Sequence, residues 1–314
     1  MSEWKKVKLG DVSQYVDDKI AIAATNESYY VSTDSMLKDK GGIIDPESIP
    51  LNGNVTRYQS DDILVSNIRP YFKKIWFSNR EGGCSNDVLV FRAQKDVTPR
   101  YLYYILSSNT FFEHMMAGAN GTKMPRGNKK LIMNYSFELP SLPMQHRIAT
   151  ILSRYDSLIE NYQKQIKLLE ESAQRLYKEW FIDLRFPGHE NTKIVDGVPE
   201  GWEKANLGTL VEFKRGKTIT KKEVVEGNIP VVAGGLEPAY YCNKFNTSER
   251  VITISGSGAN AGYTRMYFEK VWASDCSFAD SSMTPYLHFV FCFLHDNKTI
   301  IDNMQKGAAQ PHVY

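Results

Sequence analysis

The glycine-rich run "GSGANAG", residues 256–262, has a spacing that suggests a phosphate-binding loop. It follows the strand-like run "VITIS", and a loop of this kind cradles phosphates when it joins a strand to a helix. The spacing is G-x-G-x-x-x-G, however, and the β-like run "YTRMYF" follows where a helix is required. The glycines therefore indicate a tight turn or a close approach of the backbone to a partner.

Three residues with metal-binding side chains, His288, Cys292 and His295, lie at helical spacing in the run "YLHFVFCFLH". Thiolate and imidazole are the ligands that zinc prefers. The run is otherwise apolar, so a cysteine buried on a core face is the favoured interpretation. No metal site is predicted.

Motifs for catalysis are missing from the sequence. It contains no N-P-P or D-P-P motif typical of amino-methyltransferases, and no serine or cysteine nucleophile has a credible partner base. We therefore predict no catalytic residue and no cofactor, and the chain alone is not expected to be an enzyme.

The elements that would carry a binding site occur twice. "SEWKKVKLGDV" at the N-terminus is repeated as "EGWEKANLGTL" at residues 200–210, so that Trp4 aligns with Trp202 and Gly10 with Gly208. Four further pairs follow in the same order: "ILVSNIRPYFKKIWFS" with "VITISGSGANAGYTRMYF", "GGCSNDVLVF" with "VWASDCSFAD", "RYLYYILSS" with "PYLHFVFCF", and "NGTKMPRG" with "KGAAQPHVY". Asp87 then lies opposite Asp275 or its neighbour. A duplicated domain is the favoured interpretation.

Each copy is rich in β-branched and aromatic runs separated by Gly, Asn and Asp turns, which predicts strands. One helix follows late in each copy, at Pro99–His114 and at Thr284–His295. Strands and helices do not alternate regularly, so the fold class is predicted to be α+β.

A long helix is predicted between the copies, because apolar residues recur there in alternating steps of four and three. Such a stripe needs a partner helix to cover it. Pro143 suits the first turn and Ser141 its cap, and the helix should be roughly 55 Å long. A core helix of a globular domain is the alternative. The seam residues are Ile148, Leu152, Tyr155, Ile159, Tyr162, Ile166, Leu169, Ala173, Leu176 and Trp180.

Composition sets further limits. The 38 basic residues nearly balance the 36 acidic ones, which neither requires nor excludes a nucleic-acid partner. No apolar run approaches the length of a membrane span, and the N-terminus has no apolar signal core. The four cysteines form no C-x-x-C pair and are interpreted as reduced thiols, so a cytoplasmic location is expected.

The order of these elements resembles the specificity subunit of type I restriction–modification enzymes. That family has two divergent β-rich domains, each opening W-x-x-x-x-L-G, separated by a long helix beginning L-P-x-x-x-Q-x-x-I-A-x-I-L. The residues that carry the resemblance are Trp4, Leu9, Gly10, Gln145, Ile148, Ala149, Ile151, Leu152, Trp202, Leu207 and Gly208.

The resemblance implies four segments. They are a first target-recognition domain at 1–140, a conserved coiled-coil helix at 141–182, a linker at 183–200 and a second target-recognition domain at 201–314. Family members usually carry a second long helix after the second domain, and this sequence ends at Tyr314 before one. A fragment, an engineered truncation and a naturally shortened chain are the open interpretations.

The resemblance also implies DNA recognition without catalysis. Each domain would read one half of a split target in double-stranded DNA, and the helix would dock methyltransferase subunits, with a restriction subunit joining for cleavage. Without a second helix in the chain, two copies are expected to pair through their central helices as a homodimer. The alternative is a stand-alone two-domain enzyme or a carbohydrate-binding protein with β-rich repeats.

Polar turns in both copies are compatible with this function, since Arg, Lys, Asn, Ser and Gln contact phosphates and base edges. For any single residue, a solvated surface side chain is the competing interpretation. The candidates are Ser66, Asn67, Arg69, Tyr71, Lys73, Lys74, Thr122, Lys123, Arg126 and Lys129 in the first copy, and Lys214, Arg215, Lys217, Ser255, Ser257, Asn260, Arg265, Gln310 and His312 in the second.

Overall fold

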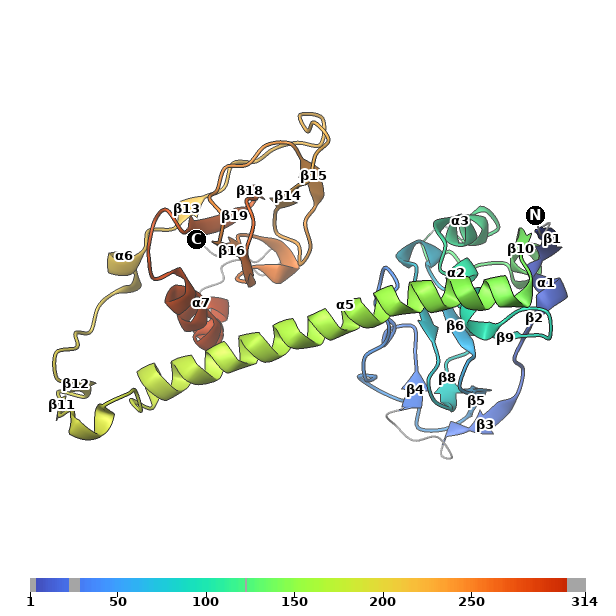
Figure 1. The fold of residues 1–314 in the computed structure, drawn as a ribbon, viewed down its shortest axis with the longest axis horizontal. Helices are drawn as coiled ribbons and strands as arrows, with labels where there is room; N and C mark the ends of the chain where they lie inside the picture. The colour runs from blue at the N-terminus through green and yellow to red at the C-terminus, as the bar shows by residue number, and fades with distance from the viewer. Residues whose placement is uncertain (1–3, 23–28, 122, 304–314) are drawn as a thin grey trace. The chain divides into compact units, whose positions relative to one another are not determined.

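The computed structural model describes residues 4–22, 29–121 and 123–303. Contacts between Cα atoms divide the chain into two compact units, residues 1–161 and 162–314, and each contains strands and helices (Figure 1). The expected α+β class is confirmed. Within the described ranges, no helix is both long and apolar enough to cross a membrane.

The main sheet of the first unit has the strand order β2-β9-β6-β7, and all its neighbours are antiparallel. Ile63 and Val65 of β6 belong to one core cluster and Leu64 to another, as the two-residue period of a strand requires. Both faces of the sheet are therefore covered. The strands are β2 (Ser13–Tyr15), β6 (Ile63–Ser66), β7 (Ile75–Phe77) and β9 (Val88–Ala93).

A second sheet of the first unit, β3-β5-β8-β4, covers the Leu64 face, where Tyr58 and Cys84 pack against Leu64. Its strands are β3 (Lys19–Ala21), β4 (Tyr30–Val31), β5 (Asn54–Tyr58) and β8 (Gly82–Cys84). β4 and β8 are parallel, and the other pairs are antiparallel. A separate antiparallel pair, β1 (Lys5–Lys8) with β10 (Ser136–Leu139), joins the start of the chain to the segment before the long helix.

Two helices cover the other face of the main sheet, where the sequence predicted one helix at Pro99–His114. They are α2 (Pro99–Leu106) and α3 (Asn109–Ala117). The prediction of a single helix was wrong because Ser108 has extended backbone and caps α3, its Oγ accepting a hydrogen bond from the Phe111 N–H at 3.2 Å. The short helices of this unit are α1 (Leu9–Val12), η3 (Pro70–Phe72) and α4 (Lys129–Ile132).

The main sheet of the second unit repeats that of the first, with the order β13-β19-β16-β17 and antiparallel pairing. A helix of one turn precedes it in each unit, α1 in the first and α6 (Leu207–Leu210) in the second, and both begin at the leucine of the repeated Leu-Gly motif. The expected pair of similar β-rich domains is confirmed. The strands are β13 (Lys214–Arg215), β16 (Val251–Ser255), β17 (Thr264–Tyr267) and β19 (Cys276–Asp280).

The remaining elements of the second unit differ more from the first. A sheet β15-β14-β18 contains β14 (Ile229–Val232), β15 (Tyr240–Cys242) and β18 (Trp272–Ala273), and η6 (Gly258–Asn260) lies in the glycine-rich turn. The helix expected at Thr284–His295 is α7 (Leu287–Asp296), followed by α8 (Lys298–Asn303). Helix α7 begins later than expected because the Thr284 hydroxyl accepts a hydrogen bond from the Tyr286 N–H at 3.1 Å, and this bond forms a turn before the helix.

The segment expected to be a polar linker contains η5 (His189–Asn191) and a small hairpin of β11 (Ile194–Val195) and β12 (Val198–Pro199). Its turn residues, Asp196 and Gly197, have φ of 51° and 78°. Asp-Gly favours the turn in which both central residues are left-handed, which fits the twist of a hairpin.

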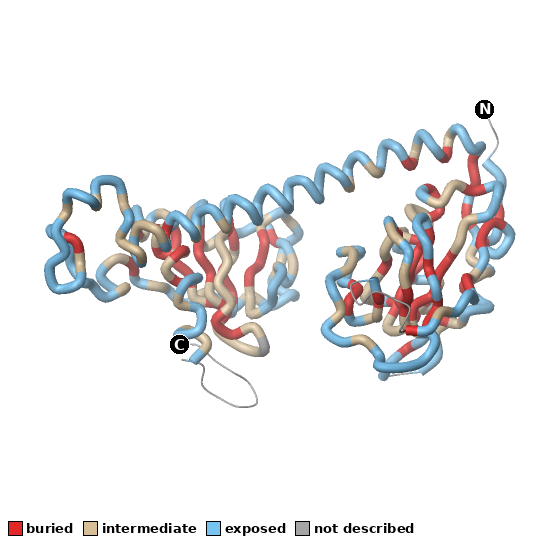
Figure 2. The backbone as a smooth tube through the Cα atoms, turned by 90° about the horizontal axis from the view of Figure 1, so that it is seen from below, coloured by how far each residue is buried: buried red, intermediate tan, exposed pale blue. Residues whose placement is uncertain are grey.

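The long helix, α5 (Leu142–Tyr177), has 36 residues and continues as the π-helical η4 (Lys178–Ile182). At 1.5 Å per residue α5 is about 54 Å long, as expected. Its first turn is closed by a hydrogen bond from the Gln145 N–H to the Ser141 carbonyl at 2.9 Å. Figure 2 shows exposed backbone along most of α5, with buried positions near its start.

Gln145 anchors the start of α5 to the first unit and is 1% exposed. Its Oε1 accepts a hydrogen bond from the Thr98 N–H at 2.9 Å, and its Nε2 donates to the carbonyls of Asp96 and Pro140 at 3.0 and 2.9 Å. The amide therefore joins α5 to the turn before α2 and to the end of β10. A glutamine at this position is needed because the site requires two donors and one acceptor.

We predict that Gln145→Ala destabilises the first unit by about 2–4 kcal/mol, because the buried Pro140 carbonyl and two less buried backbone groups, at Asp96 and Thr98, lose their partners. Native-state hydrogen exchange of the β6 and β9 amides measures this free energy. The matched control is Gln163→Ala on the exposed part of α5, which should change it by less than about 0.5 kcal/mol. Equal effects of the two variants would contradict the anchoring role of Gln145.

Candidate nucleic-acid interface

The polar turn of the first unit, residues 66–74, leaves the main sheet at the end of β6. Ser66 is buried, and its Oγ donates a hydrogen bond to the Ile68 carbonyl at 3.1 Å. Arg69 and Lys73, on either side of η3, have φ of 49° and 50°. Left-handed backbone at residues other than glycine persists only where the surrounding structure holds it. The turn is therefore a fixed element.

A second predicted segment, residues 120–128, is joined to this turn by backbone hydrogen bonds. The Arg69 N–H donates to the Pro125 carbonyl at 2.8 Å, and the Gly127 N–H donates to the Asn67 carbonyl at 3.2 Å. Arg126 is held in turn by a reciprocal pair of bonds with Asn120, both 2.9 Å long. Two runs that are about fifty residues apart in the sequence thus form one surface, which we call the paired turns.

A third segment, which the sequence did not reveal, lies beside the paired turns. The Asp39 N–H donates to the Phe72 carbonyl at 2.9 Å, and the Lys40 N–H donates to the Lys73 carbonyl at 3.0 Å. The Lys38 ammonium lies 4.4 Å from the centre of the Phe72 ring. Lys38 and Lys40 are exposed and add positive charge. Their run, "KDKGG", is typical of any solvated turn, so only the contacts identify them.

The predicted residues of the first unit differ in how far they can reach a ligand. Ser66 and Asn67 are buried, so these two shape the paired turns, whereas Tyr71, Lys123, Arg126 and Lys129 are exposed. Arg69, Lys73 and Lys74 are partly buried, and Thr122 lies outside the described residues.

The two adjacent lysines of the turn are engaged within the unit. The Lys74 ammonium donates to the Thr33 carbonyl at 2.6 Å, and burial lowers the pKa of this group from its usual value. The Lys73 ammonium donates to Asn109 Oδ1 at 3.0 Å. Unlike these two lysines, Arg69 and Asn67 each have a buried side-chain atom, Nε and Oδ1, for which no hydrogen-bond partner is found. A buried donor without a partner costs free energy unless a ligand satisfies it.

The strand ends of the two units correspond position by position. In the pairing of β6 with β9, Ser66 faces Val88, and in the pairing of β16 with β19, Ser255 faces Cys276. Ser255 therefore corresponds to Ser66, and Asp275 to Asp87, for which the sequence had allowed Asp275 or its neighbour.

The hydrogen bonds at these strand ends are also similar. The Ser66 Oγ donates to the carbonyl two residues ahead, and the Ser255 Oγ lies 3.4 Å from the equivalent carbonyl, sharing its one hydrogen with the closer Gly234 carbonyl at 3.2 Å. The Asn67 N–H donates to the Asp87 carbonyl at 2.8 Å, and the Gly256 N–H is 3.5 Å from the Asp275 carbonyl.

The second unit places the glycine-rich turn against residues 234–237. Ser255 Oγ and Asn260 Nδ2 donate to the Gly234 carbonyl at 3.2 and 3.4 Å, and Arg265 Nη1 donates to the Leu236 carbonyl at 2.8 Å. Ser255 is buried, and Ser257, Asn260 and Arg265 are partly buried. The turn is therefore fixed at one edge of a sheet and does not lead into a helix of a dinucleotide-binding fold.

Three predicted basic residues approach the same end of this sheet. The chain at β13 and just after it carries the exposed side chains of Lys214, Arg215 and Lys217, and the Gly216 N–H donates to the Cys276 carbonyl at 2.8 Å. Cys276 also pairs with Ser255, the residue from which the glycine-rich turn starts. The basic run and the glycine-rich turn therefore lie at the same end of the sheet. Gln310 and His312 lie outside the described residues.

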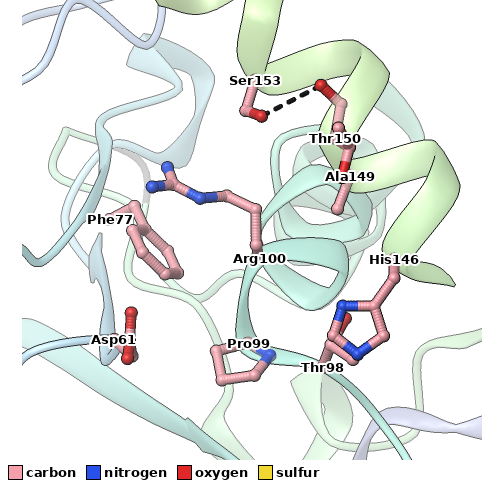
Figure 3. Close-up of a pocket in the computed structure, with 9 residues that line it drawn as sticks. All are labelled: Asp61, Phe77, Thr98, Pro99, Arg100, His146, Ala149, Thr150 and Ser153. Carbon is pink, nitrogen blue, oxygen red and sulfur yellow. Dashed lines mark hydrogen bonds between the residues drawn. The ribbon is translucent and has the colours of Figure 1, made fainter. Parts of the chain in front are cut away.

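A hollow near the start of α5 is lined by residues of α2 and α5 and presents no paired nucleophile and base (Figure 3). Arg100 lies over the Phe77 ring, 3.9 Å from its centre, and His146, Thr150 and Ser153 line the side formed by α5. The hydrogen bond among the residues drawn runs from the Ser153 hydroxyl to the Thr150 carbonyl at 3.2 Å. Neither hydroxyl is paired there with a base, as a nucleophile would require.

The cysteines and histidines of the described residues do not form a reactive or metal-binding centre. Burial raises the pKa of the Cys84 and Cys276 thiols to about 12, which keeps them protonated and weakly nucleophilic. Cys292 is buried in α7, and burial raises its pKa too. In the described ranges no group of three or more His, Cys, Asp or Glu residues is arranged to hold a metal ion.

The predicted seam of α5 is largely exposed. Ile159, Ile166 and Leu169 are 55%, 56% and 71% exposed, and Leu152, Tyr155, Tyr162, Ala173 and Leu176 are also exposed. Ile148 and Trp180, at the two ends, are partly buried. An apolar strip of this length on a surface marks an interaction site.

Comparisons with known proteins agree with these observations. A family model described as the type I restriction modification DNA specificity domain matches residues 1–171 and 199–314. The MjaIX type I restriction enzyme specificity subunit of Methanocaldococcus jannaschii is 28% identical over 242 residues, which cover 69% of this chain and 56% of the relative. The MjaVIII specificity subunit of the same organism is 27% identical over 233 residues, 72% of this chain and 53% of the relative. The chain spans about half the length of the curated relatives it matches.

A solved structure has the same fold. The crystal structure of a type I restriction-modification system S subunit from M. genitalium matches with a TM-score of 0.53 and 17% identity, covering 96% of this chain and 79% of that one. The expected architecture of two β-rich domains and a long helix is thus found in a second protein.

We predict that Gly127→Ala separates the paired turns. The added Cβ would lie 2.8 Å from Asn67 Oδ1 and 3.0 Å from Ile132 Cδ1, and overpacking of this kind costs about 1–3 kcal/mol. Hydrogen exchange of the Arg69 and Gly127 amides should accelerate accordingly. The control is Gly208→Ala in α6, where no atom lies within 4 Å of the added Cβ. Unchanged exchange in Gly127→Ala would show that the turns do not depend on this contact.

Proposed function

The chain belongs to the type I restriction modification DNA specificity family, as its motifs predicted, and from this premise we propose that it reads a two-part target in double-stranded DNA for a separate methyltransferase. Residues 1–140 and 201–314 each read one half of the target. Residues 141–182 form the helix that sets the distance between the halves and docks the methyltransferase subunits, and residues 183–200 connect helix and second domain. A restriction subunit acts through the same complex.

The observation that carries this proposal is that β6 in the first unit and β16 in the second end with the same arrangement of residues. Each main sheet ends in a serine and an aspartate that hold a polar turn in place, and two similar readers suit the two half-sites of a roughly two-fold symmetric duplex. Arg, Lys, Asn and Ser side chains at such turns supply the phosphate contacts that position a protein and the base contacts that specify a sequence.

The candidate DNA-binding residues form one group in each domain. In the first domain the paired turns carry Arg69, Tyr71 and Arg126, Lys129 follows them at the start of α4, and Lys38 and Lys40 lie beside them. In the second domain Lys214, Arg215 and Lys217 lie with Ser257, Asn260 and Arg265 at one sheet end. The basic side chains compensate for phosphate charge, and affinity should therefore fall steeply with salt. The chain itself contributes recognition, and the chemistry comes from its partner.

The test is reconstitution of the chain with a methyltransferase subunit of a type I system from the same host. The complex should methylate DNA within a split sequence, and sequencing of methylated fragments from a random library identifies that sequence. Methylation without sequence preference would contradict the proposal, as would methyl transfer by the chain alone.

We predict that Arg69→Ala weakens binding of the reconstituted complex to its target by about 1–3 kcal/mol, since it removes the guanidinium, whose Nε is a donor without a partner in the described structure. If Arg69 reads a base, the loss is confined to one position of one half-site. If it binds a phosphate, the loss is uniform and the salt dependence falls by about one charge. The matched control is Arg57→Ala, an exposed arginine paired with Glu81. Unchanged affinity in a folded Arg69→Ala complex would exclude Arg69.

The exposed seam of α5 pairs with a second long helix. In the purified chain that helix is α5 of a second copy in antiparallel orientation, because a two-fold axis lets the same strip cover itself. Burying each large seam side chain contributes roughly 1.5–3 kcal/mol, which outweighs the cost of association when several are buried together.

We therefore predict that Ile159→Asp with Ile166→Asp abolishes this pairing, because two carboxylates would be buried in an apolar contact. Sedimentation equilibrium should show a dimer for the unchanged chain and monomers for the variant. Ser157→Asp with Lys164→Asp is the matched control, since it places two carboxylates at the same spacing on the opposite side of α5. A monomer that persists at tens of micromolar in the unchanged chain would contradict the dimer.

A further inference from the structure

Asp87 carries an exposed carboxylate on the surface proposed to meet DNA, where negative charge is unfavourable. Its side chain is 38% exposed, and it lies beside the basic residues of the paired turns. A carboxylate there repels phosphates unless it has a specific task. An ordinary solvated ion pair is the simplest alternative, because exposed pairs contribute little to stability.

The ion-pair partner of Asp87, Arg126, indicates what this carboxylate does. Nη2 of Arg126 lies 3.1 Å from one carboxylate oxygen of Asp87 and 3.3 Å from the other. The carboxylate engages this one nitrogen and leaves Nε, Nη1 and the second hydrogen of Nη2 to other acceptors. The backbone of Arg126 is fixed as well, by its two hydrogen bonds with Asn120. The guanidinium is thus oriented before any ligand arrives.

The second unit repeats this arrangement with different chemistry. Asp275 occupies the register position of Asp87, and its Oδ2 accepts a hydrogen bond from the Ser257 hydroxyl at 2.5 Å. A serine hydroxyl that donates to a carboxylate has only lone pairs left for a ligand. The aspartate therefore fixes Arg126 as a donor in the first unit and Ser257 as an acceptor in the second.

Two copies that have diverged in most of their turns keep this carboxylate and use it in the same way. Their backbones match too, because each aspartate carbonyl faces the N–H of the residue after the strand-end serine. Ser257 follows its strand-end serine where Ile68 stands in the first unit, so the two aspartates hold partners from different segments. A solvated ion pair in the first unit would give no reason for the second unit to hold a polar side chain against the corresponding aspartate.

We propose that Asp87 and Asp275 are positioning residues that set which base is read in each half-site, an inference that rests on the proposed reading of DNA. Arg126, held by Asp87, reads guanine in the major groove, because the guanidinium hydrogens that Asp87 leaves free can donate to the O6 and N7 acceptors. Ser257, held by Asp275, accepts a hydrogen bond from the amino group of adenine or cytosine. Preorganisation makes the contact specific, since little side-chain freedom is lost on binding.

The experiment uses the chain assembled with its methyltransferase and a library of randomised DNA duplexes. Bound duplexes are sequenced, and the base preference at each position is compared between variants. Asp87→Asn keeps the size of the side chain and the backbone contacts but removes the charge. It should lower the preference for guanine at one position by about tenfold, while binding to other sequences stays equal or increases.

Arg126→Lys keeps the positive charge and removes the planar fork, and it should lower the same preference at the same position. The double variant should behave like either single variant, because Asp87 acts through Arg126. Asp275→Asn should change a position in the other half-site. Glu81→Gln, which removes an exposed carboxylate paired with Arg57, is the control for net charge and should leave every preference unchanged.

The outcomes separate this inference from the proposed function. If the unchanged complex shows no split target, the proposed function itself fails. If it shows one and Asp87→Asn preserves every base preference, the positioning role of Asp87 is overturned. Additive effects of Asp87→Asn and Arg126→Lys would also overturn it. Should Asp87→Asn fail to fold, Arg126→Lys decides, because Arg126 is exposed and its loss of preference at one guanine is required.

Discussion

In both units the polar turns are held at the point where two central strands of the main sheet stop pairing, β6 with β9 in the first unit and β16 with β19 in the second. Where β6 and β9 separate, backbone groups leave the ladder and must find new partners. On one strand a serine hydroxyl, of Ser66 or Ser255, faces the backbone carbonyl two residues ahead. On the other strand an aspartate carbonyl, of Asp87 or Asp275, faces the N–H of the residue after that serine. The polar turns begin from these fixed points. Because the framework is made of hydrogen bonds to the backbone, the side chains beyond it are free to differ between the units.

This framework explains how strained and unpaired groups persist in the first unit. Arg69 and Lys73 have left-handed backbone, and Asn67 Oδ1 is buried without a partner. Each of these costs free energy, and the hydrogen bond from the Gly127 N–H to the Asn67 carbonyl, at 3.2 Å, helps to keep the paired turns together. Such groups are typical of a surface organised for a ligand, whose binding satisfies them.

The long helix combines opposite properties at its start and along its length. Gln145 is buried with its amide fully hydrogen-bonded, so the direction of α5 relative to the β10 end of the first unit is fixed. Beyond that anchor the seam is exposed. A helix with a rigid attachment and an open apolar strip is suited to hold a domain while a partner helix covers it.

Local patterns in the sequence predicted most of the elements. Ser141 and Pro143 predicted the start of α5 to within a residue, and the alternating steps of four and three predicted its apolar seam. The repeated motifs predicted two similar β-rich units. The single helix expected at Pro99–His114 was wrong because serine competes for backbone hydrogen bonds, and Ser107 and Ser108 lie where α2 ends and α3 is capped. The hairpin at Ile194–Pro199 was missed although its Asp-Gly turn is a recognisable signal.

The sequence by itself determined the duplication, the α+β class, the seam of α5 and the family, because each depends on order and spacing along the chain. It also identified the polar turns as sets. The tertiary structure alone decided which of their residues meet. It joined residues 66–74 to 120–128, brought in Lys38 and Lys40, buried Ser66 and Ser255, and paired Asp87 with Arg126. These contacts connect residues far apart in the chain, and their geometry follows from strand register and packing, which no local pattern encodes.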